Sequence, residues 1–356
     1  MSLQAAATTT EPAGDWLAFH IFYAANPRPM MVDCIRPLLA ELTGDGLISG
    51  YFFINYWLEG PHVRLRLRPA TPRHSQQVRD RAEAAIAAFL RARPALYQVR
   101  PGFLSDFYNT LFDLEYPDTD RAAFQGTDGR MNIRPNNTCS LEPYEPEYGK
   151  YGGPAGIDLA EWHFQASSDL VIDAVSSMNL HLRTVLLGTS AQLMMVMASC
   201  FLTDRDELID YLERYYEFWH KAFRGTSFIG SEEYESVFTE VGSSLGARFA
   251  EIRASIGAGR LDQLPTFLRG WAEHSLELKE RAVQLARRGE LVFRSWDGLR
   301  DETITDPARA LTTLLSPYLH MTNNRLHVTI RDEAYLAYVL GRALREHLPE
   351  PAVSLR

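Results

Sequence analysis

The segment from Gly50 to Arg68 constrains the fold more than any other part of the chain. It contains two runs of aromatic and aliphatic residues, at 51–58 and 62–68, joined by a Glu-Gly-Pro turn. The second run alternates aliphatic residues with arginines, as Val63-Arg64-Leu65-Arg66-Leu67-Arg68. Because successive side chains of a strand point to opposite faces, this run predicts a strand with one apolar face and three guanidiniums on the other.

The first hundred residues predict an antiparallel sheet with two helices. Strands are expected at 16–23, 51–58 and 62–68, helices at 30–43 and 75–93, and a further extended piece at 97–103. This order is the β-α-β-β-α-β arrangement of ferredoxin-like folds. Residues 103–157 are rich in Asn, Pro, Gly and Tyr and are expected to form a long irregular connection, which is often a functional feature.

From about residue 159 onward the pattern becomes helical. Helices are expected at 189–202, 206–223, 232–255, 263–288, 306–318 and 333–347. The first of these is apolar nearly all round and should be buried. The fold class is therefore α+β, with a flexible tail at 1–14, an α+β part at 15–157 and a mainly helical part at 158–356, and the last two parts should form one domain.

Composition excludes several classes of function. The 36 Lys and Arg against 45 Asp and Glu give a net charge of −9, which argues against broad nucleic-acid binding. No apolar run is long enough for a membrane span, and the N-terminus lacks the features of a signal peptide. The cysteines are isolated, as expected for reduced thiols in the cytoplasm: Cys34, Cys139 and Cys200. No metal or cofactor motif is present, so neither is expected.

Three ordered segments resemble motifs of one known family. They are Gly60-Pro61-His62-Val63-Arg64-Leu65-Arg66, Glu147-Tyr148-Gly149-Lys150-Tyr151-Gly152-Gly153 and His320-Met321-Thr322-Asn323-Asn324-Arg325-Leu326. With the aromatic strand that starts at Trp16, they make the chain similar to the thiopeptide-type bacteriocin biosynthesis domain. That domain is also the C-terminal elimination domain of class I lanthipeptide dehydratases. The resemblance extends from about Trp16 to about His347.

The resemblance implies a stand-alone lyase of ribosomal peptide natural-product biosynthesis. Such an enzyme removes glutamate from glutamylated Ser or Thr of a precursor peptide and leaves dehydroalanine or dehydrobutyrine. Its implied partners are the precursor peptide and a separate glutamylation enzyme in a split dehydratase. The resemblance implies no cofactor, no direct contact with nucleic acid and no membrane, and it leaves a homodimer open.

Motif position assigns roles to individual residues. Arg64 and Arg66 correspond to the arginines that bind glutamate, and a guanidinium can grip a carboxylate with two hydrogen bonds. His320 corresponds to the catalytic histidine, whose imidazole can take and return a proton near neutral pH. The other candidates are Lys150 and Glu147 for catalysis, and His62, Arg68 and Arg325 for substrate binding. We expect Arg64, Arg66, Lys150 and His320 to line one cavity.

Two departures from the family pattern leave alternatives open. Lys150 stands where the family has an arginine and lacks the planar fork, and Asn55 stands where relatives commonly place an arginine. One alternative is a pyridine synthase, which joins two dehydroalanines in a formal cycloaddition and releases the leader peptide. Another is a non-catalytic subunit that binds a leader strand at an exposed sheet edge. The retained Arg64, Arg66 and His320 favour elimination.

Overall fold

The computed structural model describes residues 15–97, 131–222, 232–295 and 298–347, with single residues 111 and 124 between the first two ranges. The chain forms two compact units. The first unit comprises Met1–Val99 with Ile133–Glu145, and the second comprises Arg100–Asn132 with Pro146–Arg356. Each unit is described by itself below. The expected division of the chain into parts 15–157 and 158–356 stays a prediction.

A four-stranded antiparallel sheet in the order β2-β3-β1-β4 forms the centre of the first unit. The strands are β1 (Leu17–Phe22), β2 (Ile48–Tyr56), β3 (His62–Pro69) and β4 (Thr138–Glu142). This is the strand order of a ferredoxin-like fold. The predicted α+β class and the predicted hairpin of β2 with β3 are confirmed, with Phe52 opposite Arg66 and Ile54 opposite Arg64.

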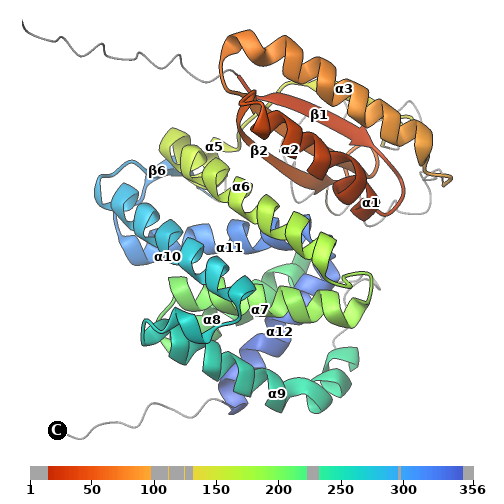
Figure 1. Cartoon of the computed structure of the whole chain (residues 1–356). Helices are drawn as coiled ribbons and strands as arrows, with labels where there is room; N and C mark the ends of the chain where they lie inside the picture. Colours follow the sequence, from red (N-terminus) through yellow and green to blue (C-terminus); the bar gives the residue numbers. More distant parts are fainter. Residues whose placement is uncertain are drawn as a thin grey trace, which may run out of the picture. The chain divides into compact units, whose positions relative to one another are not determined.

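Helices cover one face of this sheet (Figure 1). The first helical segment runs through α1 (Arg28–Met30), a π-helical turn (Met31–Ile35) and α2 (Arg36–Gly44), and the second is α3 (Ser75–Ala92). Helix α2 packs on β2, while α3 packs on β1, β3 and β4. The covered face carries the alternating apolar residues of the strands, such as Phe19 and Leu65, which have no exposed surface.

The fourth strand comes from a segment that the sequence pattern assigned to an irregular connection. Strand β4 pairs antiparallel with β1, so that Ser140 lies opposite His20. The predicted connection over 103–157 is therefore wrong for its last third, which holds β4 and the first helices of the second unit. β4 escaped detection because it is a short edge strand whose residues are mostly exposed. The extended piece expected at 97–103 falls, beyond residue 97, outside the described residues.

The second unit is mainly helical, as predicted. Its helices are α5 (Tyr148–Tyr151), α6 (Gly153–Ser177), α7 (Arg183–Phe201), α8 (Arg205–Ala222), α9 (Glu232–Gly257), α10 (Thr266–Arg287), α11 (Pro307–Arg325) and α12 (Ile330–His347). A small hairpin of β5 (Val292–Arg294) and β6 (Asp301–Thr303) was not predicted. Helix α11 continues well past the predicted end at 318 although Pro317 lies inside it, and this extension places His320 on a helix.

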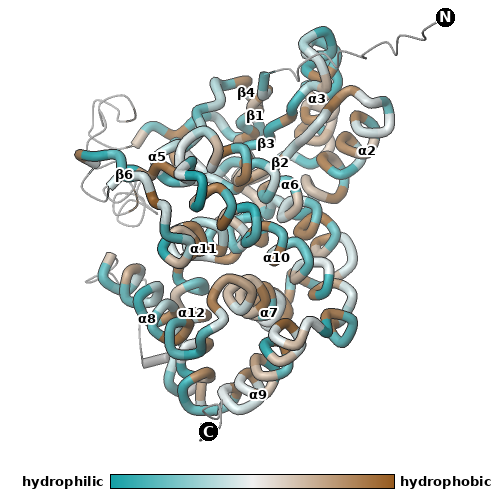
Figure 2. Tube along the Cα trace, turned by 90° about the vertical axis from the view of Figure 1, so that its left-hand side faces the viewer, coloured by the Kyte–Doolittle hydropathy of each residue, from teal (hydrophilic) through white to brown (hydrophobic). Residues whose placement is uncertain are grey.

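Helix α7 is the core helix of the second unit. Among the described residues it is the one helix long and apolar enough to cross a membrane by length and composition. However, 67% of its most apolar window is buried inside the structure. It packs against α9, α10, α11 and α12, and Figure 2 shows it as a brown segment among them. The burial predicted for 189–202 is therefore confirmed.

The Tyr-Gly-Gly motif shapes the junction between α5 and α6. Gly152 and Gly153 have positive φ angles of 93° and 78°, which favour glycine. The Gly152 carbonyl accepts a hydrogen bond of 3.0 Å from the Val292 amide of β5. Tyr151 is 1% exposed and stacks on Tyr318 of α11 with ring centroids 6.0 Å apart. The motif thus anchors this turn to the β5 hairpin and to the helical core.

Replacing Gly156 with alanine should destabilise this junction. An added Cβ would lie 1.9 Å from the Tyr151 carbonyl oxygen, a backbone atom that cannot move away alone. We expect a loss of about 3 kcal/mol or more in the free energy of unfolding, at or above the upper end for overpacking. Denaturant unfolding measures it. The control is Gly188→Ala on α7, whose Cβ would meet nothing within 4 Å and should be neutral or stabilising.

Candidate functional site

The register of β3 places its three arginines on the face of the sheet opposite the helices. Residues that are paired across an antiparallel sheet lie on the same face. Arg64 pairs with Ile54 of β2 and His20 of β1, and Arg66 pairs with Phe52 and Ala18. The intervening Val63, Leu65 and Leu67 are buried on the helix side, so the predicted alternation is confirmed. We call the side with Arg64, Arg66 and Arg68 the arginine face.

Each guanidinium of the arginine face lies on an aromatic ring. The contacts, measured from the guanidinium carbon to the ring centroid, are Arg64 on Tyr56 at 3.6 Å, Arg66 on Phe52 at 5.1 Å and on Tyr144 at 4.8 Å, and Arg68 on Trp16 at 5.7 Å. Such stacking engages the flat side of a guanidinium, whereas its N–H groups lie in the plane and point outward from it.

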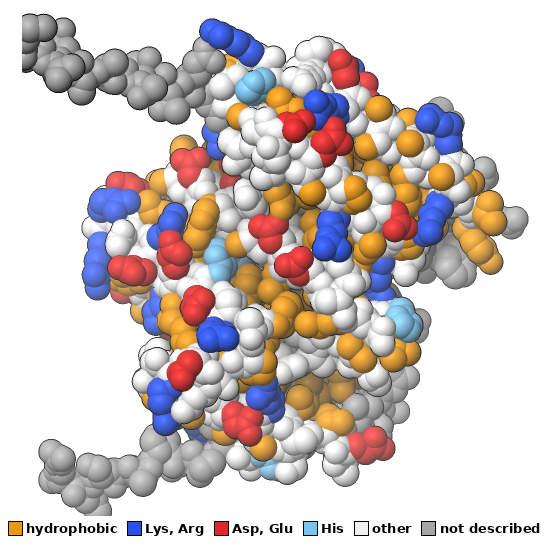
Figure 3. All heavy atoms as spheres, in the orientation of Figure 1, with side chains coloured by type: hydrophobic (Ala, Val, Ile, Leu, Met, Phe, Trp, Pro, Cys, Tyr) orange, Lys and Arg blue, Asp and Glu red, His pale blue; other side chains and the backbone are white. Residues whose placement is uncertain are grey.

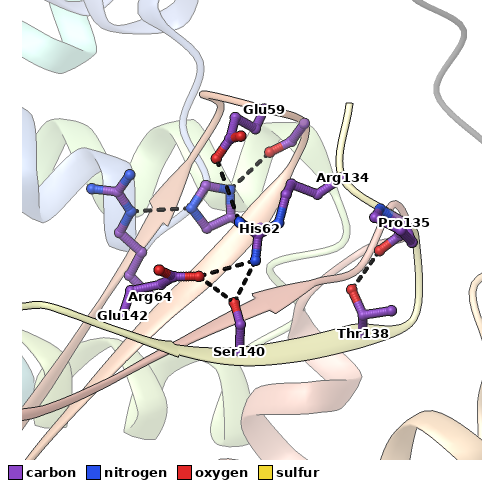
Figure 4. A network of polar contacts seen from close by, with 9 residues as sticks. Glu59, His62, Arg64, Arg134, Pro135, Thr138, Ser140 and Glu142 are labelled. Atoms are coloured by element: carbon purple, nitrogen blue, oxygen red, sulfur yellow. Dashed lines mark hydrogen bonds and ion pairs between the residues drawn. The ribbon is translucent and has the colours of Figure 1, made fainter. Parts of the chain in front are cut away.

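His62 fixes the orientation of Arg64 (Figure 4). The Arg64 Nε–H donates to His62 Nε2 at 3.0 Å. Because arginine can only donate, His62 must carry its proton on Nδ1, which lies 2.8 Å from the Gly60 carbonyl oxygen. Burial and the Arg64 charge lower the pKa of His62 to about 3. His62 is therefore a neutral acceptor that holds Arg64.

A second polar network, not predicted from the sequence, lies on the same face. Arg134 Nη2 donates to Ser140 Oγ at 2.8 Å and to Glu142 Oε1 at 3.0 Å (Figure 4). The Ser140 hydroxyl also donates to Glu142 Oε1 at 2.7 Å. These hydrogen bonds, that of Ser140 first, lower the pKa of Glu142. In the sequence only the charges of Arg134 and Glu142 indicated such a network, because the strand that carries Ser140 and Glu142 was not recognised.

In the second unit His320 belongs to a cluster drawn from three helices. Its Nδ1 lies 3.0 Å from Oε2 of Glu333 on α12, and the other oxygen of Glu333 accepts a hydrogen bond from the Tyr215 hydroxyl on α8. The His320 ring lies 5.4 Å from that of Trp219, also on α8. The Glu333 side chain is 1% exposed and that of His320 is 22% exposed. Glu333 and Tyr215 were not predicted as members of this cluster. An acidic residue near the start of a helix, such as Glu333, usually interacts with the helix dipole.

Lys150 and Glu147 form a surface ion pair. Lys150 Nζ lies 3.4 Å from Glu147 Oε1, and their side chains are 44% and 60% exposed. Within the described residues the carboxylate that contacts His320 is Glu333, whereas Glu147 contacts Lys150. The predicted catalytic roles of Lys150 and Glu147 stay predictions.

Arg325 lies inside the helical core. It is 2% exposed, donates from Nη1 to the Met321 carbonyl at 2.9 Å and lies over the Phe164 ring at 4.6 Å. These contacts engage one side of the guanidinium and one of its N–H groups. Its predicted role in substrate binding stays a prediction, as do those of Arg68 and His62.

The predicted site residues are distributed over both units. Arg64 and Arg66 lie in the first unit, and Lys150 and His320 lie in the second. That these four line one cavity stays a prediction.

Charges on the surface are mixed in sign. On the face drawn in Figure 3, the coloured residues show acidic and basic side chains interspersed, without a broad basic area. In the part of the chain that the structure describes, no group of three or more His, Cys, Asp and Glu side chains is arranged to hold a metal ion.

Buried histidines should make the protein sensitive to acid. The pKa is lowered from 6.5 to about 3 for His62 and His20 and to about 4 for His274, in each case mainly by burial. Between these values and 6.5 the unfolded chain binds more protons than the folded chain. The free energy of unfolding should therefore fall as the pH drops below 6.5, by up to about 1.4 kcal/mol per pH unit for each histidine.

Urea unfolding at pH 7 and pH 5 tests this expectation. His62→Gln should reduce the difference between the two pH values, because one such histidine is removed. The exposed His181→Gln serves as the control for loss of an imidazole. An unfolding free energy that is equal at both pH values in the unchanged protein would contradict the prediction.

Comparisons with known proteins agree with the fold. The structure is similar to the pyridine synthase TbtD from thiomuracin biosynthesis, with a TM-score of 0.68, 22% sequence identity and coverage of 92% of this chain and 97% of that chain. For TsrL the TM-score is 0.63 and the sequence identity is 15%, with coverage of 93% of this chain and 95% of that chain. For the tRNA-dependent lantibiotic dehydratase MibB from Microbispora sp. 107891 the TM-score is 0.47 and the sequence identity is 16%. The match covers 96% of this chain and 28% of that chain. The first two similarities, at such low identity, show the fold alone.

A comparison with curated proteins gave no match. A family model, described as the C-terminal part of the lantibiotic biosynthesis dehydratase, matches residues 16–344. The match covers nearly the whole chain and contains all three motifs singled out in the sequence. The chain therefore belongs to the lantibiotic dehydratase C-terminal family, whose members are enzymes that modify ribosomally made peptides.

Proposed function

We propose that the protein eliminates glutamate from glutamylated Ser or Thr of a precursor peptide, as the stand-alone half of a split dehydratase. The observation that supports this most is the arginine face. Arg64 is held by His62 and stacked on Tyr56, and among the described residues its two Nη atoms make no hydrogen bond or ion pair. A guanidinium fixed in this way is prepared to bind a carboxylate. We place the reaction in the cytoplasm, after a separate enzyme has formed the glutamyl ester.

The chemistry assigns one task to each kind of side chain. His320 takes the α-proton of the modified residue, and the electrons of that C–H bond form the Cα=Cβ double bond. The Cβ–O bond breaks, and glutamate leaves with the freed carboxylate carrying the negative charge. Arg64 and Arg66 bind the two carboxylates of the departing glutamate, and positive charge near the substrate also stabilises the enolate-like oxygen of the transition state.

A second candidate function is that of a pyridine synthase. The fold match to TbtD, which covers almost all of both chains, favours it. That reaction depends on holding two dehydroalanines close together and on proton transfer, and it would not need a glutamate pocket. The retained Arg64, Arg66 and His320 are the reason to rank elimination first.

Truncating the arginine face should stop elimination. In Arg64→Ala we expect glutamylated peptide to accumulate, with a loss in rate on the order of a hundredfold or more, because a charged carboxylate loses its partner. His320→Ala should accumulate the same ester. Mass spectrometry of the peptide measures both. The control is Arg79→Ala, which removes an exposed arginine from α3 on the other side of the sheet.

The same assay separates the alternatives. If the unchanged protein removes no glutamate but releases the leader from an already dehydrated peptide, it is a pyridine synthase. If both peptides keep their masses while the leader binds tightly, the protein is a binding subunit.

The substitution Lys150→Arg should be tolerated or should raise the rate of elimination. Lys150 is 44% exposed, so the larger guanidinium has room. It would restore the planar fork that the family carries before Tyr-Gly-Gly and could grip a carboxylate with two hydrogen bonds. The measurement is the initial rate of glutamate release. Lys150→Gln removes the charge and should be slower than both, and a faster Lys150→Gln would contradict a role for charge here.

A further inference from the structure

We propose that Glu333, held in place by Tyr215, is the positioning residue that fixes His320 with its proton on Nδ1 and with Nε2 as the atom that exchanges protons with the substrate. The role in the reaction rests on the proposed function. The protonation pattern does not, and it can be measured without any substrate.

The first support is the way Glu333 is held. Its carboxylate is 1% exposed and is approached from both sides, by the Tyr215 hydroxyl at Oε1 and by His320 Nδ1 at Oε2, 3.0 Å away. Helices α8, α11 and α12 each contribute one of these groups. A buried carboxylate is expensive unless its oxygens accept hydrogen bonds, so both contacts are needed.

The second support is the direction of each hydrogen bond. The Tyr215 hydroxyl donates to one oxygen of Glu333. The proposal assigns the ionised form to Glu333, so its other oxygen accepts as well. Burial and the nearby Glu333 raise the pKa of Tyr215 well above its ordinary value, so its hydroxyl keeps the proton that it donates. His320 must then donate from Nδ1, which leaves the lone pair of the neutral imidazole on Nε2.

The third support is the surroundings of the ring. The Trp219 ring lies 5.4 Å from that of His320 at an angle of 40°, and Trp219 is itself buried, which restricts rotation of the imidazole. The buried carboxylate of Glu333 contacts the Nδ1 edge of the ring, while the His320 side chain is 22% exposed. Within the described residues Nε2 of His320 makes no hydrogen bond, so it is available to a substrate.

The direct test is ¹⁵N NMR of the protein with labelled histidines. The two ring nitrogens have distinct shifts in the two neutral tautomers, and His320→Gln identifies the signals of His320. We expect the Nδ1–H form in the unchanged protein. His62 is the internal control, because Arg64 and the Gly60 carbonyl impose the same tautomer on it in another part of the chain. A neutral His320 protonated on Nε2 would overturn the proposal.

Variants connect the tautomer to the reaction. Glu333→Gln offers a donor as well as an acceptor to Nδ1, so the Nδ1–H form should no longer be exclusive, while the His62 signals stay unchanged. If the protein eliminates glutamate, kcat should fall at least about tenfold with KM nearly constant, because His320 only loses its orientation. Tyr215→Phe, which keeps the carboxylate, should show a smaller decrease of the same kind.

The outcomes distinguish this proposal from the proposed function. The expected tautomer, with its loss in Glu333→Gln, in a protein that removes no glutamate would support the positioning role and reject elimination. Elimination by the unchanged protein together with an unaltered tautomer and an unaltered kcat in Glu333→Gln would support the function and reject the positioning role.

Discussion

The register of β3 between β2 and β1 is the constraint on which the rest of the first unit depends. Since side chains alternate along a strand, a slip of one residue would turn three guanidiniums into the helix-covered face, where Leu65 and Leu67 have no exposed surface. Burying those charges without partners would cost more free energy than the strand pairing contributes to stability. The correct register instead sets each arginine beside an aromatic ring of a neighbouring strand or of a segment close to it. His62, at the start of the same strand, then meets Arg64 two residues later.

Features that depend on residues close together in the sequence could be predicted, whereas features that depend on pairing between distant segments could not. The β2–β3 hairpin and most of the helices are set by local periodicity and were predicted, whereas α5 (Tyr148–Tyr151) and α6 (Gly153–Ser177) were not. Strand β4 was missed because its pairing with β1 joins segments more than a hundred residues apart, and its own residues carry no clear alternation of burial. The same holds for the site. Motifs pointed to Arg64 and His320, but the carboxylate that contacts His320 comes from another helix, which only the folded chain brings near.

The two departures from the family pattern have different weight in the structure. Asn55 pairs with Val63, so the register places it with the apolar residues that face the helices and not with the arginines. An asparagine there takes no charge away from the arginine face. Lys150 is different, because it lies on α5 directly before Tyr151 and keeps its ammonium group at the surface beside Glu147. Of the two departures, only Lys150 therefore changes the chemistry of a predicted site residue, because a lysine lacks the planar fork of an arginine.

His62 and His320, two histidines of the family motifs, have different surroundings at one of their two ring nitrogens. In both, Nδ1 faces a buried oxygen acceptor, a carbonyl for His62 and a carboxylate for His320. The difference lies at Nε2. In His62 that nitrogen accepts the Nε–H of Arg64, and burial beside this charge lowers the pKa to about 3, so the imidazole cannot take a proton near neutral pH. In His320 the opposite edge of the ring has no such donor among the described residues. His62 therefore orients an arginine, whereas the contacts of His320 leave Nε2 open, as the proposed proton transfer requires.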